Sequence, residues 1–268
     1  MRRETVLAGH LHAEWTKLRT LPSSWWLAAA IPLLTLALGA AALASLTAHV
    51  CPSLAACHED TVKLSLTGIW AAQAAALILG VLSMGGEYAT GTIRTTLTAM
   101  PARGRVLAAK ATALAALTAT AATAGVLPCL LLARLILPTN GFTKKTDHPL
   151  PTLTDPSTLR ATFGSVLCLA LVALLGLALA TLLRGTSAAV TLGLGVLYVV
   201  PLLADILASP TWQDRLNRWT PMPAALSIQA TRDLDRLPIA PWPGLAVLAA
   251  YAATLLAGAA LLLGSRDA

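Results

Sequence analysis

The side chains best suited to bind a metal ion or form a disulfide are concentrated in one short segment between two apolar runs. They are His49, Cys51, Cys57, His58, Glu59 and Asp60. Their spacing matches no strong zinc signature, so we predict no metal site. A disulfide between Cys51 and Cys57 is the preferred interpretation, because the five intervening residues permit it and an oxidising exterior favours it. Free thiols and a metal site are the alternatives.

Motifs for nucleotide hydrolysis or covalent catalysis are absent from the sequence. A phosphate-binding loop needs the pattern GxxxxGK[ST], and the glycines between Gly85 and Gly91 are not followed by the required lysine. Paired histidines with a glutamate, as in zinc hydrolases, and the GxSxG pattern of serine hydrolases are also missing. We therefore predict no catalytic residue and no cofactor bound by this chain.

Three polar side chains interrupt otherwise apolar runs, namely Gln73, Arg134 and Asp205. Polar groups in such runs are costly, so each is a candidate for lining a pathway or pairing with another helix. Arg134 and Asp205 fall near the ends of their runs, where long side chains often extend to the membrane surface. Gln73 is deeper, and either an interhelical hydrogen bond worth about 1 kcal/mol or a substrate contact would explain it.

The elements that position these residues are predicted to be membrane-spanning helices. Hydrophobic residues make up 56% of the chain and charged residues only 12%, which is too little polar surface for a soluble globule of this size. Six runs reach the length of about 20 apolar residues that a spanning helix needs. The sequence thus predicts an all-α polytopic membrane protein. Its spans are expected near 25–48, 64–85, 111–137, 161–183, 186–208 and 243–264.

The charge distribution predicts a cell-membrane protein with both termini in the cytoplasm. With that orientation the cytoplasmic segments contain ten basic and four acidic residues, a net charge of +6 out of the formal +7. The basic character therefore indicates topology and contact with membrane lipids, and we expect no nucleic-acid partner. Residues 1–24 are predicted to precede a six-helix domain formed by 25–268.

The segment before the first span has the pattern of an interfacial helix. Leu7, Leu11, Trp15 and Leu18 share one helical face, while charged residues that include Glu14, Lys17 and Arg19 lie mostly elsewhere. An indole has an apolar body and one polar N–H, which suits the depth of the headgroups.

The loop between the second and third spans, 86–105, contains a short predicted helix. Thr92 to Met100 can form about two turns before Pro101, with Ile93, Leu97 and Met100 on one face. A short amphipathic helix on a cytoplasmic loop favours a protein partner.

Two segments resemble the permease subunits of ABC-2 type transporters, especially actinobacterial ones. They are GEYATGTIRTTLTAMPARGRVLAAK at 86–110 and AEWTKLRT at 13–20. The resemblance implies an N-terminal interfacial helix, a coupling helix between the second and third spans, and short outer helices before the sixth. It also implies that Glu87, Arg94 and the helix around Thr92–Met100 bind a separate ATP-binding subunit, which would hold ATP and Mg.

By the same resemblance, a second copy or a paralogue of the permease completes the transporter as a dimer. Because the spans contain few charges, we expect the exported compound to be amphipathic or hydrophobic. An antibiotic, a peptide or a lipid-like molecule would fit, and export of an antibiotic would confer antibiotic resistance. The alternatives are a secondary carrier, a membrane-embedded enzyme, and a membrane anchor or sensor that transports nothing.

Overall fold

The computed structural model describes residues 2–45, 60–99, 103–140, 150–207 and 209–265, and every regular element in these ranges is helical. The first half contains α1 (Arg2–Thr20), α2 (Pro22–Ser45), α3 (Thr61–Ser65), α4 (Ile69–Thr90), α5 (Thr92–Ala99) and α6 (Arg103–Thr139). The second half contains α7 (Pro156–Leu183), α8 (Thr186–Leu194), α9 (Val200–Leu207), α10 (Pro210–Trp219), α11 (Pro221–Leu226) and α12 (Pro241–Ser265). The predicted all-α fold is confirmed.

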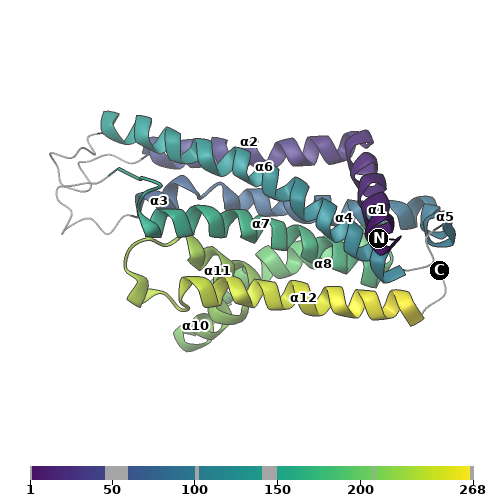
Figure 1. Cartoon of the computed structure of the whole chain (residues 1–268). Coiled ribbons are helices and arrows are strands. Elements are labelled where there is room, and N and C mark those ends of the chain that lie inside the picture. Colours follow the sequence, from purple (N-terminus) through teal and green to yellow (C-terminus); the bar gives the residue numbers. More distant parts are fainter. Residues whose placement is uncertain (1, 46–59, 100–102, 141–149, 208, 266–268) are drawn as a thin grey trace.

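Within the described residues, six helical segments are long and apolar enough to cross a membrane, as predicted. They are α2, α4, α6, α7, the segment formed by α8 and α9, and α12. The helices lie roughly along one direction, with α7 between the α2–α6 pair and α12 (Figure 1). Most of the apolar window of α7 is buried inside the protein, whereas less than a third of the windows of α2 and α12 is buried. The core is therefore built around α7, and the outer helices present apolar side chains to lipid.

The second span differs from its predicted range of 64–85. The chain forms the short helix α3, turns at 66–68 and begins the long helix α4 only at Ile69. A side chain at Gly68 would lie 2.3 Å from the carbonyl oxygen of Thr35, so the turn packs directly on α2. At its other end α4 continues to Thr90 and stops at Gly91, whose φ of 71° favours glycine. Residues 86–90 thus extend the helix instead of beginning a loop.

The fifth span contains one wide turn. Gly195–Val199 form a π-helical turn between α8 and α9, in which the N–H of Val200 donates to the carbonyl of Gly195. Pro201, the second residue of α9, has no N–H to continue a regular ladder of helical hydrogen bonds, which accounts for the irregularity before it. The wide turn places Tyr198 against α4, where its hydroxyl donates to the carbonyl of Trp70 at 2.6 Å.

The segments predicted to be cytoplasmic lie together at one end of the bundle. In Figure 1, α1 runs across this end, and α5 and the C-terminal end of α12 also lie at this end of the bundle. The guanidinium of Arg103 at the start of α6 donates to the carbonyl of Leu263 at 2.9 Å, which ties the third and sixth spans there. At the opposite end lie α3 and the short helices α10 and α11, where the resemblance implied short outer helices. The cytoplasmic orientation itself stays a prediction.

Candidate functional site

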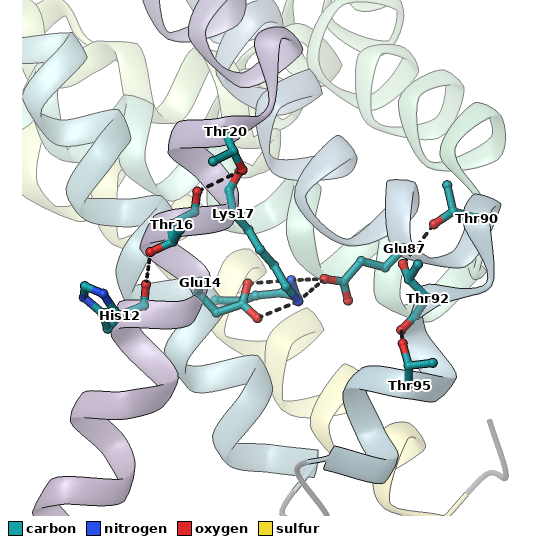
Figure 2. Close-up of polar contacts among 10 residues, drawn as sticks. His12, Glu14, Thr16, Lys17, Thr20, Glu87, Thr90, Thr92 and Thr95 are labelled. Atoms are coloured by element: carbon teal, nitrogen blue, oxygen red, sulfur yellow. Dashed lines mark hydrogen bonds and ion pairs between the residues drawn. The ribbon is translucent and has the colours of Figure 1, made fainter.

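Four charged side chains from three helices meet where α1 crosses the bundle, and we call them the charged junction: Glu14, Lys17, Glu87 and Lys110. The Lys110 ammonium donates to Glu14 at 2.7 Å and to Glu87 at 2.8 Å. The Lys17 ammonium donates to the same Glu87 oxygen at 2.9 Å and lies 3.4 Å from Glu14. Figure 2 shows these carboxylates facing one another across the lysine ammonium groups. The junction joins α1, α4 and α6.

Burial makes the pairing within the junction essential. The side chains of Lys110 and Glu14 are only 3% and 4% exposed, and an unpaired charge at such depth costs several kcal/mol. Lys17 is more open, with 43% of its side chain exposed. Partial burial by itself lowers the pKa of Lys17, because it disfavours the charged form. Hydrogen bonding to Glu87 and the charges of both carboxylates outweigh this effect, so the pKa of Lys17 is raised. Lys17 therefore stays protonated, and its ammonium and that of Lys110 contact the two carboxylates.

The position of Glu14 corrects the prediction for the N-terminal helix. The pattern placed this charged residue away from the apolar face, yet Glu14 is buried together with Leu18. It is buried because α1 turns across the bundle and meets Lys110 in the second turn of α6, which begins earlier than the predicted 111. Trp15, by contrast, is 37% exposed, and the side chain of Leu11 lies outside the described part.

The helix α5 follows the junction directly. The Thr90 and Thr92 hydroxyl oxygens lie 2.9 Å apart across Gly91, so the corner between α4 and α5 is closed by a side-chain contact. Ile93 is buried in the core, and Thr95 lines a cavity that the charged junction also lines. The side chains of Arg94 and Leu97, and all of Met100, lie outside the described residues.

A cavity of about 580 Å³ lies between α1, α4, α5 and the start of α6. All four residues of the charged junction line it, together with hydroxyl groups that include Ser83 and Thr95. In the described part of the chain, the second carboxylate oxygen of Glu87 is buried without a hydrogen-bond partner. The site thus combines a balanced set of charges with an accessible cavity beside a short helix.

The three polar residues of the apolar runs lie at separate places. Gln73 is fully buried between α4 and α7, with its amide nitrogen 4.0 Å from the sulfur of Cys168. Asp205 is exposed and accepts a hydrogen bond from Gln213 at 2.9 Å, and Arg134 is exposed on α6. None of them contributes to the charged junction, and their role in a pathway stays a prediction.

Most of the predicted ligand cluster, including Cys51 and Cys57, lies outside the described residues. Asp60 is described, and its carboxylate caps α3 by accepting from the N–H of Lys63. The same carboxylate accepts from the Thr231 hydroxyl at 2.7 Å and from the N–H of Arg232 at 3.1 Å. Asp60 therefore fastens α3 to the loop that precedes α12.

Glu14 and Lys110 were not predicted to be site residues. Both were treated as charges that set the membrane topology. Both residues lie near the ends of apolar runs in the sequence, and this position could have indicated a site. A charged side chain there either lies in the headgroup region or forms an ion pair with another charged side chain. Because the two residues are 96 positions apart in the sequence, a local pattern cannot reveal their pairing.

The fold and the site define an all-α, multi-pass membrane protein whose amphipathic first helix is joined to the bundle by buried ion pairs. In comparisons with known proteins, no family model and no curated protein matches the sequence.

Proposed function

We propose that this chain is the permease subunit of an ATP-driven exporter of the ABC-2 type. A separate ATP-binding subunit would hold ATP and Mg, and a second permease copy or paralogue would complete the pathway. The exported compound would be amphipathic or hydrophobic, because the apolar runs contain few charged groups that could bind an ionic solute.

The observation that supports this proposal best is the attachment of α5 to the charged junction. A displacement of α5 reaches α4 across the corner at Gly91, one turn from Glu87. From Glu87 it reaches α1 through Lys17 and α6 through Lys110. A partner that moved α5 would therefore act on three helices together, as an energy-coupling contact must.

The test first asks whether an adjacent reading frame encodes a soluble protein with a phosphate-binding loop, and then reconstitutes the chain with that candidate ATP-binding subunit. Arg94→Ala on α5 is expected to lower ATP-dependent transport by about 5-fold or more, because coupling between sites is typically worth 1–3 kcal/mol. Arg218→Ala on α10, at the opposite end of the bundle, is the matched control and should transport normally. Membrane insertion and thermal unfolding are measured for both variants.

Three outcomes would contradict the proposal. Equal transport by the Arg94 variant and the wild type would remove α5 from the coupling path. Transport without the ATP-binding subunit, driven by an ion gradient, would identify a secondary carrier. A correctly inserted protein that binds the ATP-binding subunit but moves no candidate substrate would be a membrane anchor or sensor.

A further inference from the structure

A second cavity, of about 380 Å³, borders α1, and none of the four charged-junction residues is among its described lining residues. It is formed where α1 meets α2 and α6, and we call it the α1 groove. Its lining residues are Trp15, Leu18, Arg19, Ser24, Trp25, Ala28, Leu117 and Thr120. Most of this surface is apolar, and none of its described lining residues is acidic. The groove thus offers one positive charge beside an apolar channel.

The position of the groove determines what can reach it. Both α2 and α6 are membrane-spanning helices, and their groove residues Trp25 and Thr120 are exposed on the surface of the bundle. An exposed apolar surface on spanning helices meets lipid chains. The exposed tryptophans Trp15, Trp25 and Trp26 mark the depth at which indoles meet headgroups. The occupant of the groove is therefore a membrane lipid.

Arg19 supplies the selectivity of the groove. Its side chain is exposed, and no ion pair to it occurs among the described residues. Its backbone carbonyl accepts a hydrogen bond from the indole N–H of Trp25 at 2.7 Å, which fixes the end of α1 against α2. This contact fixes the backbone from which the Arg19 side chain extends, and a guanidinium suits the bidentate geometry of a phosphate.

We propose that the α1 groove binds one anionic phospholipid, with its phosphate on Arg19 and an acyl chain along Trp25, Ala28 and Leu117. A lipid with net negative charge is favoured over a zwitterionic one, because the described lining residues supply a guanidinium and no carboxylate to pair with a headgroup amine. The bound lipid stabilises α1 across the bundle and thereby supports the position of Glu14 in the charged junction.

The test is native mass spectrometry of the purified full chain with dioleoyl phosphatidylglycerol or dioleoyl phosphatidylcholine. The wild type should retain one tightly bound phosphatidylglycerol. Arg19→Gln should bind it about tenfold more weakly, because a charge-assisted hydrogen bond is lost. Arg105→Gln is the matched control, since Arg105 is exposed at the same end of the bundle but does not line the groove. This control should bind like the wild type.

A second variant tests the apolar part of the groove separately. Ala28→Leu places a larger side chain where the acyl chain would lie, leaves Arg19 intact, and should also weaken binding. Thermal unfolding without added lipid checks that each variant is folded.

Three results would overturn the proposal. Equal retention of the two lipids would exclude selectivity for anionic headgroups. An equal loss in the Arg19 and Arg105 variants would indicate general charge attraction. Normal binding by a folded Ala28→Leu variant would exclude the groove as the acyl-chain site.

Discussion

The ammonium of Lys110 lies 2.7 Å from a carboxylate oxygen of Glu14, and both side chains are almost completely buried. This ion pair connects the first helix of the chain to the start of the third span. A buried pair stabilises a fold only while both partners are present, since each alone is an uncompensated charge. The position of α1 therefore depends on Lys110 as much as on its own apolar face.

Lys110→Met is expected to lower the free energy of unfolding by about 3–5 kcal/mol, because Glu14 and Glu87 lose their most buried cation. Thermal unfolding in detergent measures the change. The double variant Glu14→Met with Lys110→Met should lose less than the sum of the two single variants, since the unpaired carboxylate is removed. Strict additivity would show that the two residues do not interact.

Lys17 provides a prediction about pH. The folded-state pKa of Lys17 is raised above its ordinary value of 10.5. The contribution of Lys17 to the free energy of unfolding is therefore fully present below that pH. It is lost as pH rises further and Lys17 deprotonates. The side chain is 43% exposed, so the contribution is small, about 0.2–1 kcal/mol.

The measurement for Lys17 compares the unfolding of wild type and Lys17→Met between pH 8 and pH 11, a window set around 10.5. The difference between the two proteins should be constant up to about pH 10 and shrink above 10.5. Lys63→Met, in α3 at the opposite end, controls for the loss of a lysine elsewhere. A difference that grows with alkaline pH would contradict the assignment.

The close packing of α4 on α7 depends on glycine. A side-chain carbon at Gly80 would lie 1.9 Å from the carbonyl oxygen of Ala173, so Gly80→Ala must push the helices apart. We expect a loss of about 1–3 kcal/mol in the free energy of unfolding. Gly86→Ala in the same helix meets nothing within 4 Å and should be neutral or stabilising by up to about 1 kcal/mol. Titration with sodium dodecyl sulfate in mixed micelles compares the two, and equal losses would refute the packing explanation.

Asp60→Ala is expected to release the loop before α12, because the carboxylate holds the N–H of Arg232 and the hydroxyl of Thr231. Hydrogen exchange measured by mass spectrometry should become faster at residues 231 and 232. Asp155→Ala is the matched control, since Asp155 caps α7 by accepting from Thr158 and should leave that exchange unchanged. Unaltered exchange in the Asp60 variant would show that other contacts hold the loop.

The apolar runs by themselves determined the fold class. A run of about 20 apolar residues can satisfy its backbone in lipid only as a helix, so composition and length were enough to predict six spans. The short helix α5 was also accessible from sequence, because apolar spacing and Pro101 define two turns locally. The exact ends of the second span could not be predicted from the sequence. The turn at Gly68 depends on its contact with Thr35 in another helix.

Only the tertiary structure determined the charged junction. Local spacing assigns Glu14 to the polar side of α1 and Lys110 to a headgroup region, and both assignments are reasonable for isolated helices. The structure turns α1 across the bundle and brings the two residues together over 96 positions. Apolar periodicity shows which face of a helix avoids water, but the crossing of two helices decides which charges become buried and paired.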